Sequence, residues 1–501
     1  MSVTSLASGL KPDLIVVGGG GAGLMAALAA ARRGAKVTLI EKNQGLGGTT
    51  ALSVGTICAA TTRLQRAAGI TDSLESHYED MEKFMGERAP RDNPRLRRLL
   101  VENTPEAIAL LEAIGVTFMG PLPEPPHSQP RLHAVLPHSR SYIRHLAAAC
   151  RKSGVAILTG RRVSGLAREN GVVRGVEFEG GAAPLMAKAG VILASGDFSS
   201  ADEAYKRRFM SGPLLAIGGI NPTSTGDGQR IGASLGAEVV NGDLAWGPEI
   251  RFTAPPKPSI VSRMPTHKLV ARGLLLAMKH APQWLLRPIL LRFVTTFLAP
   301  SHKLFDEGAI LVNGNGARFC DELNRPQDAI GDQPGQTSWI VLDDAVARRF
   351  AGWPYYVSTA PGVGYAYLQD YARSRPDLYS TAPDIEGLAA KIGAPASALR
   401  DAVDRHNAAL GPGDRRKPLA KGPFHALGPA KSWIVFSEGG LRIDETFRVL
   451  DEARHPIPGL YAAGSAGQGG VLLEGHGHHL GWAFTSGMLA GRHAAEAAMR
   501  P

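Results

Sequence analysis

The strongest constraint on this chain is a glycine-rich turn that directly follows a short apolar stretch. Residues 14–17 read Leu-Ile-Val-Val and run into Gly-Gly-Gly-Gly-Ala-Gly at 18–23. A buried strand that turns into a helix over a pyrophosphate needs Gly18 at the turn, Gly20 where backbone approaches the phosphates, and Gly23 where helix packs on strand. Glu41 ends a second apolar strand at 36–40, where a carboxylate accepts hydrogen bonds from a ribose diol. This order predicts a Rossmann-type dinucleotide site.

The same stretch could also be a membrane span. Residues 14–31 include no charge over eighteen positions, which meets the length of a transmembrane candidate. Four consecutive glycines disfavour this, because glycine is a poor helix former. The end of the helix at Arg32, Arg33 and Gly34 is typical of a soluble fold. We therefore expect the nucleotide-binding structure.

Composition narrows the class of protein. Of the 501 residues, 44% are hydrophobic and 20% charged, which is ordinary for a globular enzyme of several domains. Cys58, Cys150 and Cys320 lie far apart, so the sequence indicates neither a disulfide framework nor a zinc or iron–sulfur site. Residues 1–13 lack the apolar core of a signal peptide, and we expect a cytoplasmic location. The net charge of +10 suits anionic surfaces, but no nucleic-acid-binding motif accompanies it.

The order of the segments predicts a split domain. We expect short strands at 155–158, 172–178 and 190–196 to rejoin the nucleotide-binding layer, and a helix at 229–235 that Asp227 begins. Proline- and tryptophan-bearing sequence follows 243, and at 460–465 the style of the first domain returns before an alanine-rich final helix. These changes predict a nucleotide-binding domain at 1–245, an inserted cap at 246–432, and a second segment of the first domain at 433–501.

Three separated segments together resemble the flavoprotein family of soluble fumarate reductases and 3-ketosteroid dehydrogenases. They are 16–41 with Gly-Gly-Thr-Thr-Ala-Leu-Ser at 47–53, Gly-Ala-Arg-Phe-Cys-Asp-Glu at 316–322, and Gly-Gly-Leu-Arg-Ile-Asp at 439–444 with its continuation to 464. The resemblance implies an α/β fold in which a Rossmann-like FAD-binding domain has an inserted α+β cap domain. It also implies hydride transfer between flavin N5 and a carbon next to an activating carbonyl or carboxyl group.

The motifs and the resemblance together imply a set of cofactor contacts. Flavinylated relatives have a histidine near Thr49, and this chain has none there, so we expect non-covalent FAD. The expected contacts are Gly18, Gly20, Gly23, Glu41, Lys42, Gly48, Thr49, Thr50, Ser53, Ala194, Gly196, Asp227, Gly464, Ser465 and Leu480.

Two departures from the family concern the substrate. Dicarboxylate reductases have a histidine shortly before the Gly-Gly-Leu segment and an arginine before the final Leu-Gly turn, where this chain has Phe436 and His479. A histidine with a pKa of about 6.5 cannot replace a permanently charged, bidentate guanidinium, so fumarate-like substrates are disfavoured. Arg325 falls within one residue of the reductases' proton-transferring arginine, where the steroid enzymes have a tyrosine. It is either a reductase-like catalytic residue or a surface arginine of a cap loop.

Three histidines in residues 474–482 form the most unusual local composition. A metal site is disfavoured because this loop lacks nearby carboxylate or cysteine partners, and surface histidines are a second alternative. The family's homologous loop faces the substrate side of the flavin. We therefore expect His476 or His479 to polarise a ketone oxygen or shuttle a proton. Tyr365, with other cap tyrosines, is a candidate proton acceptor or an ordinary packing residue.

The segment 268–297 joins basic and apolar residues. Lys268, Arg272 and Lys279 recur at offsets of 4 and 11, which places them in one helical stripe beside leucines, and 284–293 adds a further apolar run. This composition suits a helix in a membrane interface, and equally a cap helix packed on its own domain or a subunit contact.

The preferred function is the 1,2-desaturation of a lipophilic cyclic ketone resembling a 3-ketosteroid. One alternative is reduction of a small unsaturated acid, as in the fumarate reductases. Another is a flavin-bearing electron-transfer partner without a substrate of its own. The sequence leaves the electron acceptor and the oligomeric state open.

Overall fold

A six-stranded sheet in the order β22-β23-β10-β1-β2-β6 forms the centre of the first unit of this computed structural model. The structure describes residues 11–256, 263–282, 291, 295, 298–360 and 364–499. The strands β1, β2 and β10 are fully buried, which explains why Thr38 of β2 is the only polar residue among them. The parallel strands are β1 (Leu14–Val17), β2 (Val37–Ile40), β6 (Ala156–Leu158), β10 (Gly190–Leu193) and β23 (Pro456–Ala462), and β22 (Arg448–Leu450) pairs antiparallel with β23.

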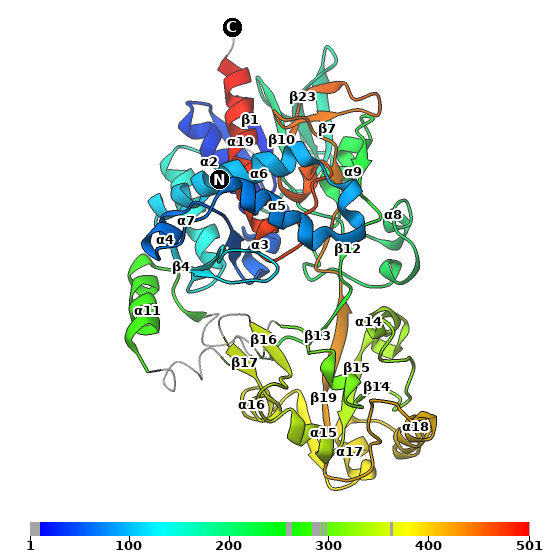
Figure 1. The fold of residues 1–501 in the computed structure, drawn as a ribbon. Helices are drawn as coiled ribbons and strands as arrows, with labels where there is room; N and C mark the ends of the chain where they lie inside the picture. Colours follow the sequence, from blue (N-terminus) through cyan, green and yellow to red (C-terminus); the bar gives the residue numbers. More distant parts are fainter. Residues whose placement is uncertain are drawn as a thin grey trace.

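Helices that include many alanine and glycine residues cover this sheet. Helix α2 (Gly21–Arg32) packs against α7 (Arg140–Lys152) and against the final helix α19 (His478–Met499). A Cβ atom at Gly487 or Gly491 would lie 2.3 Å from a backbone oxygen of α2, so glycine at these positions lets the two helices touch. Figure 1 shows α19 beside α2 and β1, although the two ends of the chain supply them.

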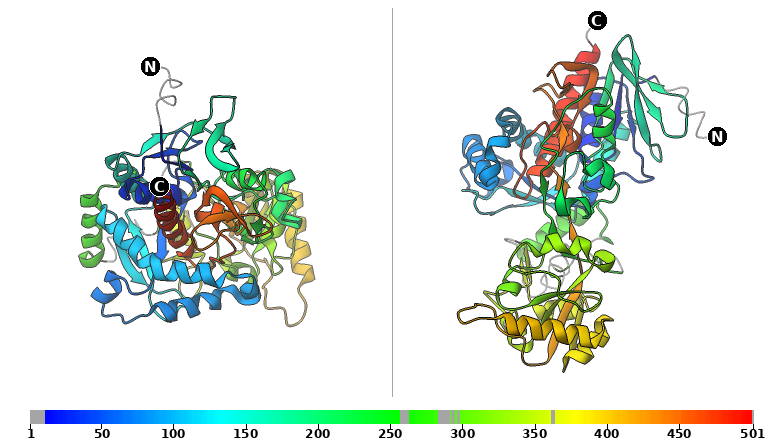
Figure 2. Two further views of the ribbon diagram at one scale, coloured as in Figure 1. Left: turned by 90° about the horizontal axis from the view of Figure 1, so that it is seen from above. Right: turned by 90° about the vertical axis from the view of Figure 1, so that its right-hand side faces the viewer.

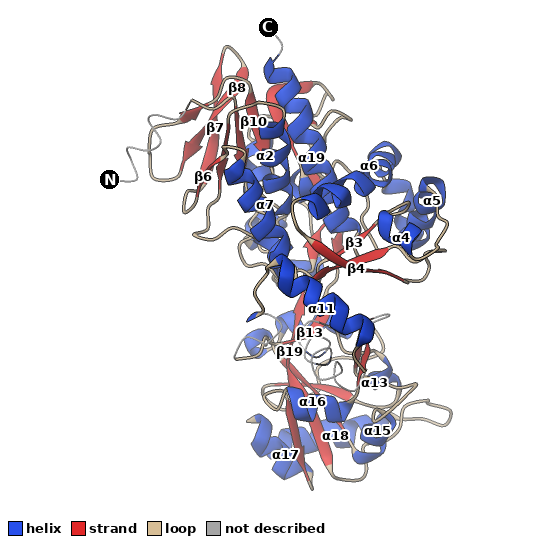
Figure 3. Ribbon diagram, turned by 90° about the vertical axis from the view of Figure 1, so that its left-hand side faces the viewer, coloured by secondary structure: helices blue, strands red, loops and turns tan. Residues whose placement is uncertain are grey.

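The strand prediction for this layer is correct for β6 and β10 and wrong for 172–178. That segment, β8 (Val172–Phe178), pairs antiparallel with β7 (Val163–Glu169) and β9 (Leu185–Met186) in a separate sheet, visible beside β10 in Figure 3. Several of its side chains are exposed or half-buried, which is typical of an antiparallel strand with one face toward solvent.

The remaining elements of the first unit surround the ends of the main sheet. Asn93 caps α6 and Pro94 occupies its first position, where a missing backbone N–H costs no helix hydrogen bond. The elements are α3 (Gly48–Leu52), β3 (Thr56–Cys58), α4 (Arg63–Ala67), α5 (Leu74–Met85), α6 (Pro94–Ala113), β4 (Thr117–Leu122), β5 (Leu132–Leu136), α8 (Glu203–Lys206), α9 (Asp227–Ala233), β11 (Val239–Val240), β12 (Ala245–Trp246), β20 (Phe436–Ser437) and β21 (Gly440–Leu441).

The second unit is an α+β cap with its own core. Its antiparallel sheet has the order β13-β19-β15-β14, with β18 also paired to β19, and its buried residues run from Ile250 to Ala430. Figures 1 and 2 show this unit stacked on one end of the first. The fold class is confirmed, and the limits 246 and 432 remain a proposal. The strands are β13 (Glu249–Phe252), β14 (Ile310–Asn313), β15 (Ser338–Leu342), β16 (Ser358–Ala360), β17 (Gly364–Ala366), β18 (Tyr379–Ala382) and β19 (Phe424–Trp433), and the helices are α13 (Lys303–Asp306), α14 (Pro326–Ala329), α15 (Asp344–Arg349), α16 (Leu368–Ser374), α17 (Ile385–Ile392) and α18 (Ala396–Ala409).

The basic stripe lies on α11 (Lys268–His280), which contacts β4 and β5 of the first unit. Leu269 and Leu276 are 69% and 60% exposed, and Lys268, Arg272 and Lys279 are also exposed. The apolar run predicted at 284–293 lies almost entirely outside the described residues. In the part of the chain that the structure covers, no helix is both long enough and apolar enough to span a bilayer.

Candidate active site

A cavity of about 250 Å³ opens at the carboxyl ends of β1, β2 and β10 and extends to the cap strand β13. Ligands of open parallel sheets bind at this edge. All the predicted cofactor residues except Gly23 line it: Gly18, Gly20, Glu41, Lys42, Gly48, Thr49, Thr50, Ser53, Ala194, Gly196, Asp227, Gly464, Ser465 and Leu480.

The glycines of the fingerprint have different roles. A Cβ at Gly23 would lie 1.9 Å from the carbonyl oxygen of Gly18, so this position sets the contact between helix and strand. At Gly20 and Gly48 the nearest atoms to an added Cβ lie 3.8 Å and 3.6 Å away, and both residues border the cavity. The backbone is therefore bare where a pyrophosphate needs close approach to the N-terminus of α2.

The ribose end of the site is defined by Glu41, which is buried. One carboxylate oxygen accepts a hydrogen bond from the Gly19 N–H at 2.7 Å and the other from the Asn43 N–H at 2.8 Å. These bonds fix the carboxylate and leave lone pairs for a ribose diol. Lys42 lies beside it and donates to Asp227 at 3.0 Å. Burial alone would raise the pKa of Asp227, but Arg162 and Lys42 hold it below its usual value.

At the opposite end of the cavity lies His476, which is paired with the buried carboxylate of Glu124. Nδ1 of His476 bonds to the Glu124 carboxylate, and the His476 backbone N–H donates to the same oxygen at 3.2 Å. The hydrogen bond to Glu124 raises the pKa of His476 above its ordinary value, while burial opposes this. The His476 side chain is 53% exposed and lines the cavity, so its second ring nitrogen is available to a ligand. The pair can therefore present a protonated imidazole to a substrate oxygen.

His479 has a different environment. Its ring lies 3.4 Å, centroid to centroid, from that of Phe436, and both residues line the cavity. Burial, with a smaller contribution from His478, lowers the pKa of His479 to about 3. Its Nε2 is buried and has no hydrogen-bond partner among the described residues. A neutral imidazole with an unpaired nitrogen suits a bound group that donates or accepts one hydrogen bond.

Several residues of the cavity were not predicted. Glu124 does not line the cavity itself but holds His476, and it lies in the proline-rich stretch 121–130. Asn221 lines the cavity and donates to Thr49 Oγ1 at 3.0 Å. Trp246, Glu249 and Arg251 come from β12 and β13, and Arg251 is paired with Glu249 at 2.9 Å. The sequence signal for these residues was a group of acidic, aromatic and basic side chains at a domain junction. The neighbouring sequence does not distinguish such residues from ordinary surface residues.

Two predicted catalytic residues lie outside the cavity. The Arg325 side chain is 63% exposed and paired with Asp328 at 2.6 Å. Tyr365 is 40% exposed on the cap, where its ring contacts those of Trp353 and Tyr356. The structure therefore brings His476 and His479 to the cavity and leaves Arg325 and Tyr365 away from it.

The fold and the cavity define a flavoprotein-type oxidoreductase with a capped site. A family model described as the FAD binding domain matches residues 13–473, and the chain belongs to this family. The bare glycine cradle and the fixed Glu41 carboxylate fit FAD, as predicted. The chain is an FAD-dependent oxidoreductase that acts on carbon–carbon bonds, as its relatives do.

Two relatives illustrate the range of the family. The chain is 28% identical to the probable fumarate reductase Ifc3 of Shewanella frigidimarina over 511 residues, which cover 97% of this chain and 75% of that protein. It is 26% identical to 4-oxocyclohexanecarboxylate 2-dehydrogenase of Sinomonas cyclohexanicum over 591 residues, which cover 96% and 92%.

Two solved structures share the fold. The open conformation of a flavocytochrome c3 fumarate reductase matches with a TM-score of 0.70 and 24% identity over 99% of this chain and 80% of that one. The 3-ketosteroid Δ1-dehydrogenase of Sterolibacterium denitrificans matches with a TM-score of 0.65 and 19% identity over 97% and 99%. The predicted resemblance to both groups of enzymes is confirmed.

Proposed function

We propose that the enzyme desaturates a lipophilic cyclic ketone, resembling a 3-ketosteroid, at the carbon–carbon bond α,β to the carbonyl. The observation that carries this proposal is an aromatic wall next to a protonatable imidazole. The Trp246 ring lies 5.5 Å from that of Phe436 and 6.0 Å from that of His476, and all three border the cavity. FAD, when bound, supplies the acceptor for the hydride.

His476 is the electrophile in this proposal. Its Nδ1–H donates to Glu124, and the proton on its other nitrogen is directed at the ketone oxygen. A carbonyl that accepts this bond is polarised, which acidifies the neighbouring C–H and stabilises the enolate charge that develops. The proton of that C–H would pass to solvent water, and the hydride from the next carbon would pass to FAD. In the resemblance, Phe436 and neutral His479 correspond to the positions at which dicarboxylate reductases hold carboxylates, which supports a ring without carboxylates as the substrate.

A second candidate is reduction of a small unsaturated acid. Arg251 borders the cavity and can approach a carboxylate, although Glu249 already pairs with it. A relative that is 28% identical is named as a probable fumarate reductase, which also favours this reaction. Arg325, the proton donor expected for it, would have to enter from its exposed position on the cap. The electron-transfer alternative does not require a histidine-lined cavity.

Flavin spectroscopy under anaerobic conditions separates the candidates. We expect cyclohexanones and 3-ketosteroids to bleach the oxidised flavin of the wild-type protein, with the ring unsaturated in the product. Reduced flavin that reoxidises rapidly with fumarate-like acids, with no bleaching by any ketone, would favour the reductase. A flavin that responds to neither class would favour the electron-transfer protein.

We also propose that α11 contacts a membrane surface and so brings the enzyme near lipophilic substrates. Exposed Leu269 and Leu276 lie seven residues apart on one side of the helix, next to the exposed basic stripe of Lys268, Arg272 and Lys279. Apolar side chains flanked by basic ones suit the interface of an anionic bilayer.

A further inference from the structure

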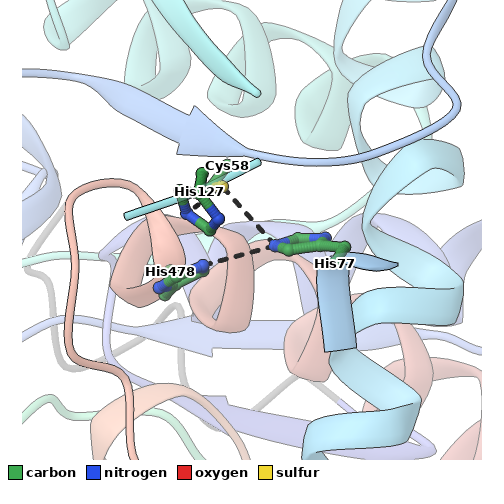
Figure 4. Close-up of side chains that lie close together, drawn as sticks. All are labelled: Cys58, His77, His127 and His478. Atoms are coloured by element: carbon green, nitrogen blue, oxygen red, sulfur yellow. Dashed lines mark hydrogen bonds between the residues drawn. The ribbon is translucent and has the colours of Figure 1, made fainter. Parts of the chain in front are cut away.

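A second group of chemistry-bearing side chains lies beside the flavin cavity. Cys58 at the end of β3, His77 of α5, His127 from the loop between β4 and β5, and His478 at the start of α19 meet at one point (Figure 4). Each side chain is at most 1% exposed. Their four ligand atoms all lie within 4.8 Å of one another.

We propose that these four residues bind one Zn²⁺ ion in a tetrahedral site. Cys58 Sγ is 3.5 Å from His77 Nε2 and 3.3 Å from His127 Nε2, and His77 Nε2 is 3.3 Å from His478 Nε2. Zinc–nitrogen bonds of about 2.0–2.1 Å and a zinc–sulfur bond of about 2.3 Å give tetrahedral edges of about 3.3–3.6 Å. Three edges already have about this length, and the ion would shorten the longer ones, which are at most 4.8 Å, by up to about 1.5 Å.

The hydrogen bonds around the group bear on which ring nitrogen of each histidine presents a lone pair to its centre. His478 Nδ1 lies 2.5 Å from the carbonyl oxygen of Glu474, so Nδ1 is the protonated nitrogen and Nε2 presents a lone pair. His127 Nδ1 lies 3.9 Å from the Asp80 carboxylate and 3.1 Å from Arg131 Nη1. Metal binding selects the Nδ1–H tautomer of His127, which donates to Asp80, and the Arg131 contact then lengthens. His77 Nδ1 is buried without a partner in the described part of the chain.

The charges near the group match a divalent ion. Asp72, Asp80 and Arg131 are buried against it and have a net charge of −1, while half-exposed Lys83 pairs with Asp80 from outside. A Zn²⁺ ion with a Cys58 thiolate has a net charge of +1, which compensates this excess. Without an ion, the Cys58 thiol and the three imidazoles would face one another in a buried space with few hydrogen-bond donors among them.

The position of the site suggests what the ion does. His127 follows Glu124 by three residues and His478 follows His476 by two, so one ion would join the two loops that hold the catalytic pair. The Cys58 N–H also donates to the Gly477 carbonyl at 3.3 Å. Four protein ligands leave no open position, which is typical of structural zinc. The ion would therefore position His476 without contacting the substrate.

Metal analysis of the purified flavoprotein tests the proposal. We expect about one zinc per chain in the wild type, or uptake of one Zn²⁺ after chelation. We expect bound Co²⁺ to give tetrahedral visible bands beyond the flavin absorption and a thiolate charge-transfer band. Cys58→Ser should remove the charge-transfer band, and His127→Gln should weaken metal binding at least 10-fold. Cys150→Ala, which removes a buried thiol elsewhere in the same unit, should change neither.

Flavin absorbance of each variant reports whether the first unit is folded. If Cys58→Ser fails to fold, the wild-type cobalt spectrum still decides the question. A wild type that takes up no zinc and shows no tetrahedral cobalt spectrum overturns the proposal. Equal zinc binding by wild type and folded Cys58→Ser also overturns it, because the metal would then lie elsewhere. Neither outcome depends on the ketone activity.

Discussion

Replacement of Glu124 by glutamine tests the role proposed for His476. In the structure the Glu124 carboxylate accepts two hydrogen bonds from His476 and raises the pKa of its imidazole. Glutamine keeps an acceptor oxygen in this place and removes the charge. The pKa of His476 then falls, because burial lowers it once the charge of the hydrogen-bonded carboxylate is gone. A smaller fraction of the imidazole would therefore remain protonated at pH 7.

This loss has a defined effect on the pH profile. If protonated His476 polarises the ketone, kcat/KM falls as the pH rises through the pKa of His476. The Glu124→Gln variant should therefore lose activity at a lower pH than the wild type, with a larger reduction at pH 7 than at pH 5.5. His476→Ala, which removes the donor, should reduce the rate by about 100- to 1000-fold.

The assay is anaerobic stopped-flow bleaching of the flavin by a cyclic ketone at a series of pH values. Glu106→Gln is the control, since it removes a carboxylate that pairs with Arg492 outside the cavity. Its profile should match that of the wild type. An unshifted profile in Glu124→Gln, or bleaching by His476→Ala at the wild-type rate, would refute the reasoning.

Cofactor attachment, pH-dependent stability and membrane contact can each be tested on the purified protein. Acid precipitation should release the flavin into the supernatant, and flavin in the pellet would show a covalent bond. Burial raises the pKa of Glu438 from 4.5 to about 8, so folded protein binds the extra proton and stability falls by up to about 5 kcal/mol as the pH rises through this window. Glu438→Gln should therefore raise the thermal midpoint more at pH 8 than at pH 5, and equal shifts would contradict this. Binding to anionic liposomes should weaken with salt and in the double variant Leu269→Ser/Leu276→Ser. The control variant Leu323→Ser, on the cap, should bind as the wild type does. No binding of the wild type at low salt would exclude the membrane proposal.

The cofactor half of the site was predictable because its signals are local. Strand, glycine turn and helix occupy adjacent residues, so the steric reasons for the glycines lie within that unit. For example, a Cβ at Gly23 would lie 1.9 Å from the carbonyl oxygen of Gly18. The return of the chain to the first domain after the cap could also be predicted, because an apolar strand such as β23 is typical of a buried parallel sheet. In the structure β23 pairs parallel with β10.

The substrate half was only partly predictable because its contacts are long-range. The carboxylate that charges His476 is 352 residues away in sequence, and the His77–His478 contact spans 401. Distances of this kind follow from the packing of α5 and α19 on the first unit, which no local pattern encodes. The predictions for Arg325 and Tyr365 depended on sequence position and residue type. Neither property determines on which side of the cap a side chain lies.

The histidine loop shows how one short segment can serve two sites. Gly475 and Gly477 have φ values of +91° and +89°, which side-chain-bearing residues rarely adopt. A Cβ at Gly477 would lie 2.5 Å from the backbone nitrogen of Cys58, so glycine also lets the loop press against β3. With these two turns, His476 and His479 border the flavin cavity while His478, between them, faces the Cys58 group. The unusual composition of the loop therefore places His476 and His479 in one chemical environment and His478 in another.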